Sequence, residues 1–231
     1  MEAIIDIKEN ADKVINNIQN ICSINGRSYQ DITIVAASKT RDITTIRQLV
    51  DNTPIKICGE NRVQEFVEKY EEDSDMDWQF IGQLQTNKVK YLIGKVSLIH
   101  SVDRIELAEK INELSHRHSI VTNILIEINM GGELTKGGVE PDEVYDFIRS
   151  IAGFENIKIM GIMSVLPNKP TEEIEPLYKK LYDIFIGLKT LPQDNLEPKY
   201  LSAGMSNDYE TAIKYGSNMV RIGTGLFGAR N

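Results

Sequence analysis

The segment Ile32-Thr33-Ile34-Val35-Ala36-Ala37-Ser38-Lys39-Thr40 points most directly to the fold. An apolar, β-branched run of this length that ends in polar residues is typical of a strand buried on both faces of a parallel sheet. Lys39 stands where this strand would emerge, and ligands bind at that end of the strands in parallel sheets and barrels. For the segment taken alone, a solvated lysine at the start of a loop is the more ordinary interpretation.

Further segments of the chain have the apolar character of strands, and segments with helical spacing lie between them. We expect the other strands at residues 54–59, 78–82, 96–100, 121–129, 157–163, 199–202 and 218–222. We expect helices at residues 2–24, 44–51, 61–72, 87–93, 103–115, 141–151, within 171–188 and at 207–215. This alternation of strands and helices favours an α/β fold with a single (β/α)8 TIM barrel over an open doubly wound sheet.

The two ends of the chain are expected to meet at the barrel seam. Few residues follow the last expected strand, so no covering helix is expected there, whereas an unmatched helix at 2–24 precedes the first strand. We therefore expect this N-terminal helix to cover the seam between the last and first strands. Residues 1–231 are then expected to form a single domain.

Three helix starts are predicted from residue type and spacing. Asn61-Arg62-Val63-Gln64 and Asp103-Arg104-Ile105-Glu106 both have the spacing of a capping box, which predicts that Asn61 and Asp103 cap helices. Pro141 suits the first turn of the helix expected at 141–151.

Composition excludes several classes of protein. The chain has 231 residues, of which 41% are hydrophobic and 26% are charged, as is ordinary for a globular protein. A net charge of -8 opposes non-specific binding to nucleic acid or anionic lipid. The acidic N-terminus does not resemble a signal peptide, and no apolar run approaches the length of a membrane span, so we expect a cytoplasmic protein. Cys22 and Cys58 lack the spacing of a zinc site or disulfide framework.

Two polar, glycine-containing segments flank the last expected strand, at residues 201–208 and 221–228. In barrels, the loops after strands seven and eight frequently bind phosphate. Ser206 and Thr224 could donate hydroxyl groups, and Gly223 and Thr224 could donate backbone amides. The alternative is that Ser206 or Asn207 only caps a helix and that Gly223 only permits a turn.

Arg221 lies inside the apolar run Met219-Val220-Arg221-Ile222, where an unpaired guanidinium would be costly. It is expected to face a carboxylate, a phosphate or an aromatic nitrogen, and a structural salt bridge is the simplest alternative. Together with Lys39 at another strand end, the phosphate-type loops suggest a phosphorylated aldehyde held as a Schiff base. A lysine amine, with an ordinary pKa of ~10.4, becomes a nucleophile when burial lowers that pKa.

The sequence resembles the YggS/PROSC (PLPBP) family of pyridoxal phosphate homeostasis proteins. The resemblance runs in order from Lys39 to the C-terminus and so covers most of the chain. The matching segments are Ala37-Ser38-Lys39-Thr40, Gly59-Glu60-Asn61-Arg62-Val63-Gln64-Glu65, residues 80–88, Ile99-His100-Ser101-Val102-Asp103, Asn129-Met130-Gly131-Gly132-Glu133, Gly161-Ile162-Met163, residues 201–208 and residues 219–230.

The resemblance implies a barrel like the N-terminal domain of alanine racemase, with pyridoxal 5'-phosphate bound to one lysine. The implied contacts are Lys39 for the Schiff base, Ser206, Gly223 and Thr224 for the phosphate, Arg221 for the pyridine nitrogen, and Asn61 and Met163 for the pocket wall. Ala203 and Gly225 stand where many members carry methionine and alanine. Neither change removes a ligand group.

A cation against the pyridine nitrogen would leave that nitrogen unprotonated and weaken the ring as an electron sink. Alanine racemase uses the same device, but it also needs a tyrosine base from a separate C-terminal domain. We therefore expect a protein that buffers pyridoxal phosphate or delivers it to apo-enzymes, with little or no turnover. The alternatives are a pyridoxal phosphate-dependent amino-acid racemase and a Schiff-base lyase that acts on sugar phosphates without a cofactor.

The remaining candidate residues give weaker indications of function. His116 and His118 are two apart on an expected helix and cannot share a face, which disfavours a metal site. His100 at a strand end is expected to support the site or the packing rather than to react. Lys136, in the glycine-containing loop at 131–138, could accept or pass on the cofactor or could be solvated. A monomer is the default expectation.

Overall fold

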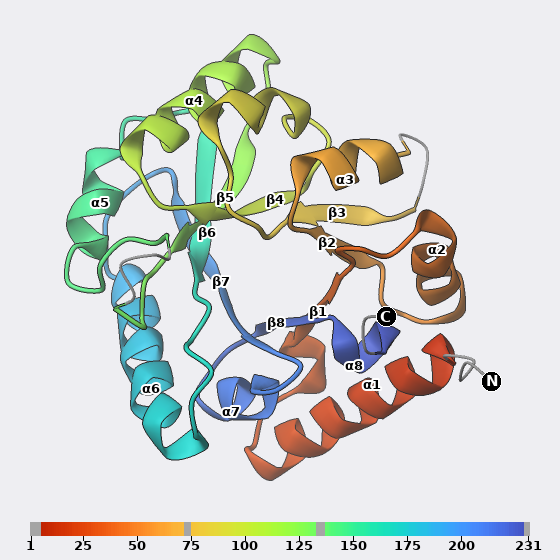
Figure 1. The fold of residues 1–231 in the computed structure, drawn as a ribbon. Coiled ribbons are helices and arrows are strands. Elements are labelled where there is room, and N and C mark those ends of the chain that lie inside the picture. Colours follow the sequence, from red (N-terminus) through yellow and green to blue (C-terminus); the bar gives the residue numbers. More distant parts are fainter. Residues whose placement is uncertain (1–5, 72–74, 133–136, 229–231) are drawn as a thin grey trace.

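Eight parallel strands close into a barrel in the computed structural model, which describes residues 6–71, 75–132 and 137–228. Each strand pairs with the next along the chain, and the last pairs with the first (Figure 1). The predicted (β/α)8 TIM barrel is therefore confirmed. The strands are β1 (Thr33–Ala37), β2 (Ile57–Glu60), β3 (Asp77–Phe80), β4 (Leu98–Val102), β5 (Thr122–Glu127), β6 (Ile157–Met163), β7 (Leu196–Met205) and β8 (Met219–Ile222).

Helices surround the barrel and bury their apolar sides against the strands. They are α1 (Ile7–Ile24), α2 (Ile43–Asn52), α3 (Val63–Lys69), α4 (Ile105–Arg117), α5 (Val144–Ser150), α6 (Thr171–Leu188), α7 (Tyr209–Lys214) and α8 (Thr224–Phe227). Two 3-10 helices, η1 (Tyr29–Asp31) and η2 (Thr86–Tyr91), complete the described elements. The helix expected at 87–93 is thus a 3-10 helix.

Apolar side chains also fill the inside of the barrel. Val35, Ile81, Leu98, Leu125, Met163 and Met219 form one buried cluster there. Because side chains alternate along a strand, the neighbours of these residues point outward to the helices. The barrel is therefore a packed core below its mouth, and a ligand has room only at the ends of the strands.

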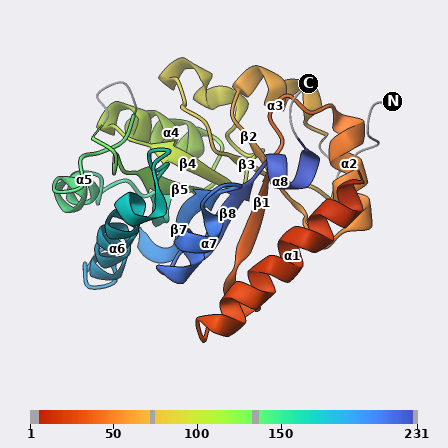
Figure 2. The same ribbon diagram turned by 60° about the horizontal axis from the view of Figure 1, so that its bottom comes forward.

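Helix α1 covers the seam between β8 and β1, as the sequence predicted. Ile18 and Ile21 of α1 belong to the same buried cluster as Ile34 of β1 and Val220 of β8. Figure 2 shows α1 running beside these two strands. A short helix that was not predicted, α8, follows β8 and contributes Leu226 and Phe227 to this cluster.

Three predicted helix starts were wrong. Arg62 and Arg104 occupy the N-cap positions of α3 and α4, and no side chain caps either helix. The backbone of Asn61 is instead held at the barrel mouth against Gly82, where an added Cβ would lie 2.1 Å from the Asn61 carbonyl oxygen. Asp103 pairs with Arg104 at 2.6 Å. Pro141 lies in a turn ahead of α5.

The described ranges contain no helix with the length and apolar character needed to cross a membrane. Nor do three or more histidine, cysteine, aspartate or glutamate side chains gather there as a metal site would require. Cys22 and Cys58 are both buried free thiols.

Candidate functional site

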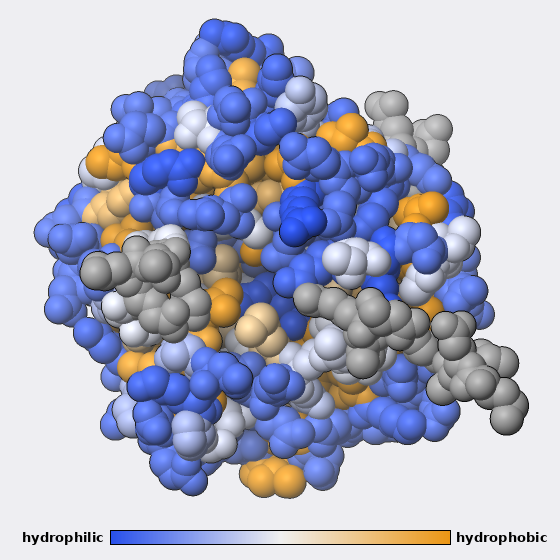
Figure 3. Space-filling model, viewed as in Figure 1, coloured by the Kyte–Doolittle hydropathy of each residue, from blue (hydrophilic) through white to orange (hydrophobic). Residues whose placement is uncertain are grey.

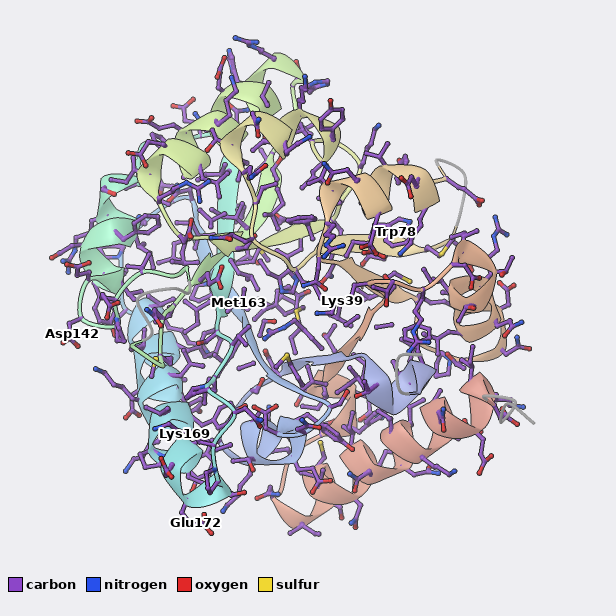
Figure 4. The ribbon with its side chains drawn as sticks, viewed as in Figure 1. Lys39, Trp78, Asp142, Met163, Lys169 and Glu172 are labelled. Carbon is purple, nitrogen blue, oxygen red and sulfur yellow. The ribbon has the colours of Figure 1, made fainter. Side chains whose placement is uncertain are left out.

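A pocket of about 310 Å³ lies at the carboxyl ends of the strands. Six of the seven residues predicted for the site line it: Lys39, Asn61, Ser206, Arg221, Gly223 and Thr224. The seventh, Met163, belongs to the buried cluster inside the barrel and is not among the lining residues. Figure 3 shows the centre of this face hollowed, and Figure 4 shows Lys39 and Met163 near the middle of the ring of strands.

The turn that carries Lys39 is fixed on both sides of the lysine. The Ser38 amide donates to the Gly59 carbonyl (3.0 Å), and the Ser38 hydroxyl donates to Glu60 Oε1 (2.7 Å). The Thr40 amide donates to Glu65 Oε2 (2.7 Å). Lys39 itself is half-buried and lines the pocket. Its backbone turn is thus held by residues that do not line the pocket, whereas Lys39 itself does.

Behind this turn lies a buried group of charged side chains. Lys69 of α3 donates to Glu60 Oε1 (2.8 Å), to Glu65 Oε2 (3.3 Å) and to the Ser38 carbonyl (3.2 Å). Burial raises the pKa of Glu60, and the contacts with Lys69 and Ser38 oppose that rise. For Glu65, burial is outweighed by the Thr40 amide and Lys69, and the pKa is lowered. Lys69 therefore joins two carboxylates to the lysine turn.

Ser206 organises the second part of the pocket. Its hydroxyl oxygen accepts hydrogen bonds from the amides of Gly223 and Gly225, each at 3.2 Å. Because the oxygen acts as acceptor in both bonds, the hydroxyl hydrogen remains available to donate to a ligand. The loops after β7 and β8 are tied together at the place where barrels often bind phosphate.

A carboxylate, Asp208, also lines this part of the pocket, but both its oxygens have partners. Oδ1 accepts from the Met205 amide (2.7 Å), and Oδ2 accepts from the Tyr178 hydroxyl (2.6 Å). Burial and the neighbouring Asp208 raise the pKa of Tyr178, which keeps this hydroxyl a donor. The loop that carries Ser206 is thereby anchored to α6.

Arg221 is only 3% exposed, yet it lines the pocket. Its Nη1 donates to the Ser202 carbonyl (2.8 Å) and hydroxyl oxygen (2.6 Å), and its Nη2 donates to the Ser164 carbonyl (2.9 Å). In the part of the chain that the structure describes, no carboxylate forms an ion pair with it. The structural salt bridge considered above is absent there, and the guanidinium is held in place by neutral oxygens.

A chain of hydrogen bonds extends from Arg221 across the barrel. The Ser202 hydroxyl oxygen lies 3.2 Å from His100 Nδ1, and His100 Nε2 lies 2.8 Å from Gln79 Oε1. Burial, and then the Arg221 charge, hold the pKa of His100 well below its usual value, so the ring is neutral. With the Gln79 oxygen as acceptor, His100 carries its proton on Nε2 and accepts from Ser202 at Nδ1. His100 therefore supports Arg221 through the Ser202 hydroxyl, which agrees with the supporting role expected from the sequence.

Glu127, at the end of β5, is a further titratable group whose charge bears on Arg221. Burial, together with Asp103, raises the pKa of Glu127 to about 7, and Arg221 opposes the rise. Sequence reasoning missed this residue. Its place in the strand, two residues after the inward-facing Leu125 and therefore on the same face, was the available signal.

The loop after β6 also contributes lining residues that were not predicted, including Leu166, Asn168 and Lys169. In Figure 4, Lys169 lies near the start of α6. It pairs with Glu173 at 3.1 Å. Lys136 lies outside the described residues. His116 and His118 lie at the end of α4 and do not line the pocket.

Comparison with known proteins places the chain in a family. The family model of the alanine racemase N-terminal domain matches residues 10–231. A pyridoxal phosphate homeostasis protein of Aquifex aeolicus (strain VF5) is 44% identical over 225 residues, which cover 96% of this chain and 97% of the relative. The chain belongs to the pyridoxal phosphate homeostasis protein family. The family member from Escherichia coli (strain K12) is 33% identical, with 98% and 97% covered.

Solved structures agree with this assignment. PipY of Synechococcus elongatus PCC7942, solved with PLP bound, has a TM-score of 0.79 at 26% identity and covers 91% of this chain and 99% of its own. An alanine racemase of Clostridium difficile 630 has a TM-score of 0.74 at 18% identity. It covers 96% of this chain and 57% of its own length, and the likeness concerns the fold alone.

Proposed function

We propose that this protein binds pyridoxal 5'-phosphate through a Schiff base with Lys39 and acts in the homeostasis of that cofactor in the cytoplasm. It would buffer the cofactor and deliver it to apo-enzymes, with little or no turnover. The observation that carries the proposal is the convergence of Lys39, Ser206 and Arg221 on one pocket. The names of the relatives and the PLP-bound PipY structure support it.

The donor set of the pocket fits the three functional groups of the cofactor. The Lys39 amine would condense with the aldehyde carbon, with loss of one water. The hydroxyl of Ser206 and the backbone of Gly223 and Thr224 would hold the phosphate, since the two loops are already joined there. Arg221, a buried cation without an ion pair in the described ranges, suits the lone pair of the pyridine nitrogen.

The other two predicted residues would act at the edges of the ring. Asn61 lines the pocket, and because it does not cap α3, its side chain is not required at the helix start. Met163 is buried inside the barrel, in the cluster that includes Val35 and Ile81. It would support the floor of the site rather than form its wall.

The arrangement around Arg221 disfavours transamination. When bound, the cofactor supplies a ring that accepts electrons from a substrate carbon, most strongly when its nitrogen is protonated. Arg221 can only donate to that nitrogen, and the bonds to Ser202 and Ser164 fix its guanidinium. A nitrogen that accepts this bond stays unprotonated. The ring then withdraws electrons from a substrate carbon only weakly, which disfavours transamination. Racemisation is possible with such a ring but needs a further proton-transferring residue, and no tyrosine or histidine of the described residues lines the pocket.

The binding step is tested by titrating purified protein with pyridoxal phosphate and recording the absorbance of the protein-bound form. Lys39→Ala should remove that absorbance band, because no amine remains at the position where the aldehyde reacts. Lys169→Ala is the matched control, since Lys169 is a second lysine that lines the same pocket. A normal band in Lys39→Ala would contradict the assignment of the lysine.

The homeostatic role is tested separately by transfer. Loaded protein is mixed with the apo form of a pyridoxal phosphate-dependent enzyme, and the recovery of that enzyme's activity is followed. Recovery in proportion to the cofactor loaded is the expected result. A loaded protein that never yields its cofactor would contradict delivery while leaving binding intact.

A further inference from the structure

Two side chains of α3 contact the backbone of the turn around Lys39. We propose that Glu65 and Lys69 of α3 are positioning residues that clamp this turn and thereby set how long pyridoxal phosphate stays bound. The proposal rests on the proposed function, because it concerns the lysine that would hold the cofactor. Neither Glu65 nor Lys69 lines the pocket, so both would act through Lys39.

The clamp closes on both neighbours of Lys39. Lys69 Nζ donates to the Ser38 carbonyl (3.2 Å), and Glu65 Oε2 accepts from the Thr40 amide (2.7 Å). Lys69 and Glu65 are themselves joined at 3.3 Å, which completes a ring of contacts around the turn. A shift of either side chain would therefore be transmitted to the backbone of Lys39.

The conformation of Thr40 indicates that the turn is held under strain. Its φ of 65° lies in the left-handed region, which a β-branched residue rarely adopts. Such a conformation persists only when the surroundings impose it, and it occurs most often at functional sites. The single contact described for the Thr40 amide is the carboxylate of Glu65. Removal of that acceptor should let the turn relax and move the lysine.

The clamp is anchored in a buried position. Lys69 is 9% exposed and Glu60 is fully buried. The three ammonium hydrogens of Lys69 have three acceptors, on Ser38, Glu60 and Glu65. Burying such charges generally stabilises a fold less than apolar side chains of the same volume would. We therefore attribute these buried charges to the geometry that they give the lysine turn rather than to a gain in the stability of the fold.

Glu65 is the better residue to change, because the clamp can be opened there without leaving a buried charge unpaired. Glu65→Ala removes the acceptor of the Thr40 amide but keeps the contact between Glu60 and Lys69. Lys69→Met would leave Glu60 buried without its cation and endanger folding. Glu68→Ala is the matched control, since Glu68 lies on the same helix and is exposed.

The experiment measures the release of pyridoxal phosphate from loaded protein into an excess of an apo-enzyme trap. We expect Glu65→Ala to release the cofactor about tenfold faster than wild type. It should also shift the pH at which the absorbance band of the bound form changes. Glu65→Gln should restore most of the wild-type behaviour, because its amide oxygen can still accept from the Thr40 amide. Glu68→Ala should behave as wild type.

A second variant tests the strained turn. Asparagine adopts the left-handed region far more readily than threonine. Thr40→Asn should therefore recover part of the loss when it is combined with Glu65→Ala. No recovery in the double variant would overturn the role assigned to the strain.

The outcomes separate the clamp from the proposed function. Wild-type release and an unshifted band in Glu65→Ala would overturn the clamp and leave cofactor binding at Lys39 intact. The clamp would also be overturned if Glu68→Ala released the cofactor as fast as Glu65→Ala does. The same holds if Glu65→Gln released it as fast as Glu65→Ala. Absence of a bound form in wild type would overturn both proposals.

Discussion

Nη1 of Arg221 donates to two oxygens of Ser202, the carbonyl at 2.8 Å and the hydroxyl at 2.6 Å. The guanidinium is therefore oriented by a residue of the neighbouring strand before any ligand arrives. Because the same hydroxyl contacts His100, and His100 contacts Gln79, residues of three other strands, β7, β4 and β3, share in fixing the Arg221 cation on β8. A preorganised donor of this kind loses little freedom on binding.

Ser202→Ala should weaken the binding of pyridoxal phosphate. The substitution removes the hydroxyl between Arg221 and His100, which frees one side of the guanidinium. Loss of one such bond corresponds to about 1 kcal/mol, or about a fivefold rise in the dissociation constant. Absorbance titration measures the change. Ser97→Ala, which removes a hydroxyl at the opposite end of the barrel, is the control, and an equal effect there would contradict the role of Ser202.

Ser206→Ala should discriminate between two ligands. The Ser206 hydroxyl joins the loops after β7 and β8, and in the proposed site it would donate to the phosphate rather than to the ring. We expect the affinity for pyridoxal phosphate to fall about tenfold or more, since hydrogen bonds to charged groups contribute about 1.5–3 kcal/mol. The affinity for pyridoxal, which lacks the phosphate, should change little. Equal losses for both ligands would argue against a phosphate site at Ser206.

Glu127 should make the stability of the ligand-free protein depend on pH. Its pKa in the folded protein is about 7, above the ordinary value for glutamate, so the folded state holds the proton more tightly than the unfolded state. The resulting stability is fully present below about pH 4.5 and is lost as pH rises to about 7. The loss amounts to at most about 3 kcal/mol.

Glu127→Gln, which resembles the protonated form, should flatten this dependence. Urea unfolding at about pH 5 and about pH 8 measures it, with the variant the more stable at the higher pH. Glu106→Gln, at an exposed position, is the control. If wild type and Glu127→Gln lose the same stability over this range, Glu127 is not the titrating group.

Loaded protein should exchange the α-proton of added amino acids with deuterium no faster than free pyridoxal phosphate does. The physical reason is the lining of the pocket: among the described residues it contains no tyrosine or histidine to move that proton, and a ring nitrogen facing Arg221 would stay unprotonated. Mass spectrometry of alanine incubated with the protein in deuterium oxide measures the exchange. Exchange well above that of the free cofactor would favour an amino-acid racemase.

The strands could be predicted because runs of apolar residues indicate buried segments directly. Residues 157–163 form β6 with the predicted bounds, and Thr171–Leu188 forms α6 as expected. Helix starts were less predictable. Asn61 lies in close approach to Gly82 instead of capping α3, and Asp103 pairs with Arg104, whose guanidinium also donates to the Leu84 carbonyl. Local spacing does not contain such tertiary contacts.

The pocket was predictable where one residue type suits one chemistry, as with Lys39, Ser206 and Arg221. The residues behind it were not. Lys69 follows Glu68 in a charged helix and resembles a solvated residue, yet it is buried between Glu60 and Glu65. Its burial depends on how α3 packs against β2, which the sequence pattern does not reveal.

Reductive trapping at Lys39 tests the central claim most directly. The protein is loaded with pyridoxal phosphate and treated with borohydride, which converts a Schiff base into a stable secondary amine, and the labelled peptide is then identified by mass spectrometry. The account predicts a single major label on Lys39, absent from Lys39→Ala. A label on another lysine, or none in loaded wild type, would contradict it.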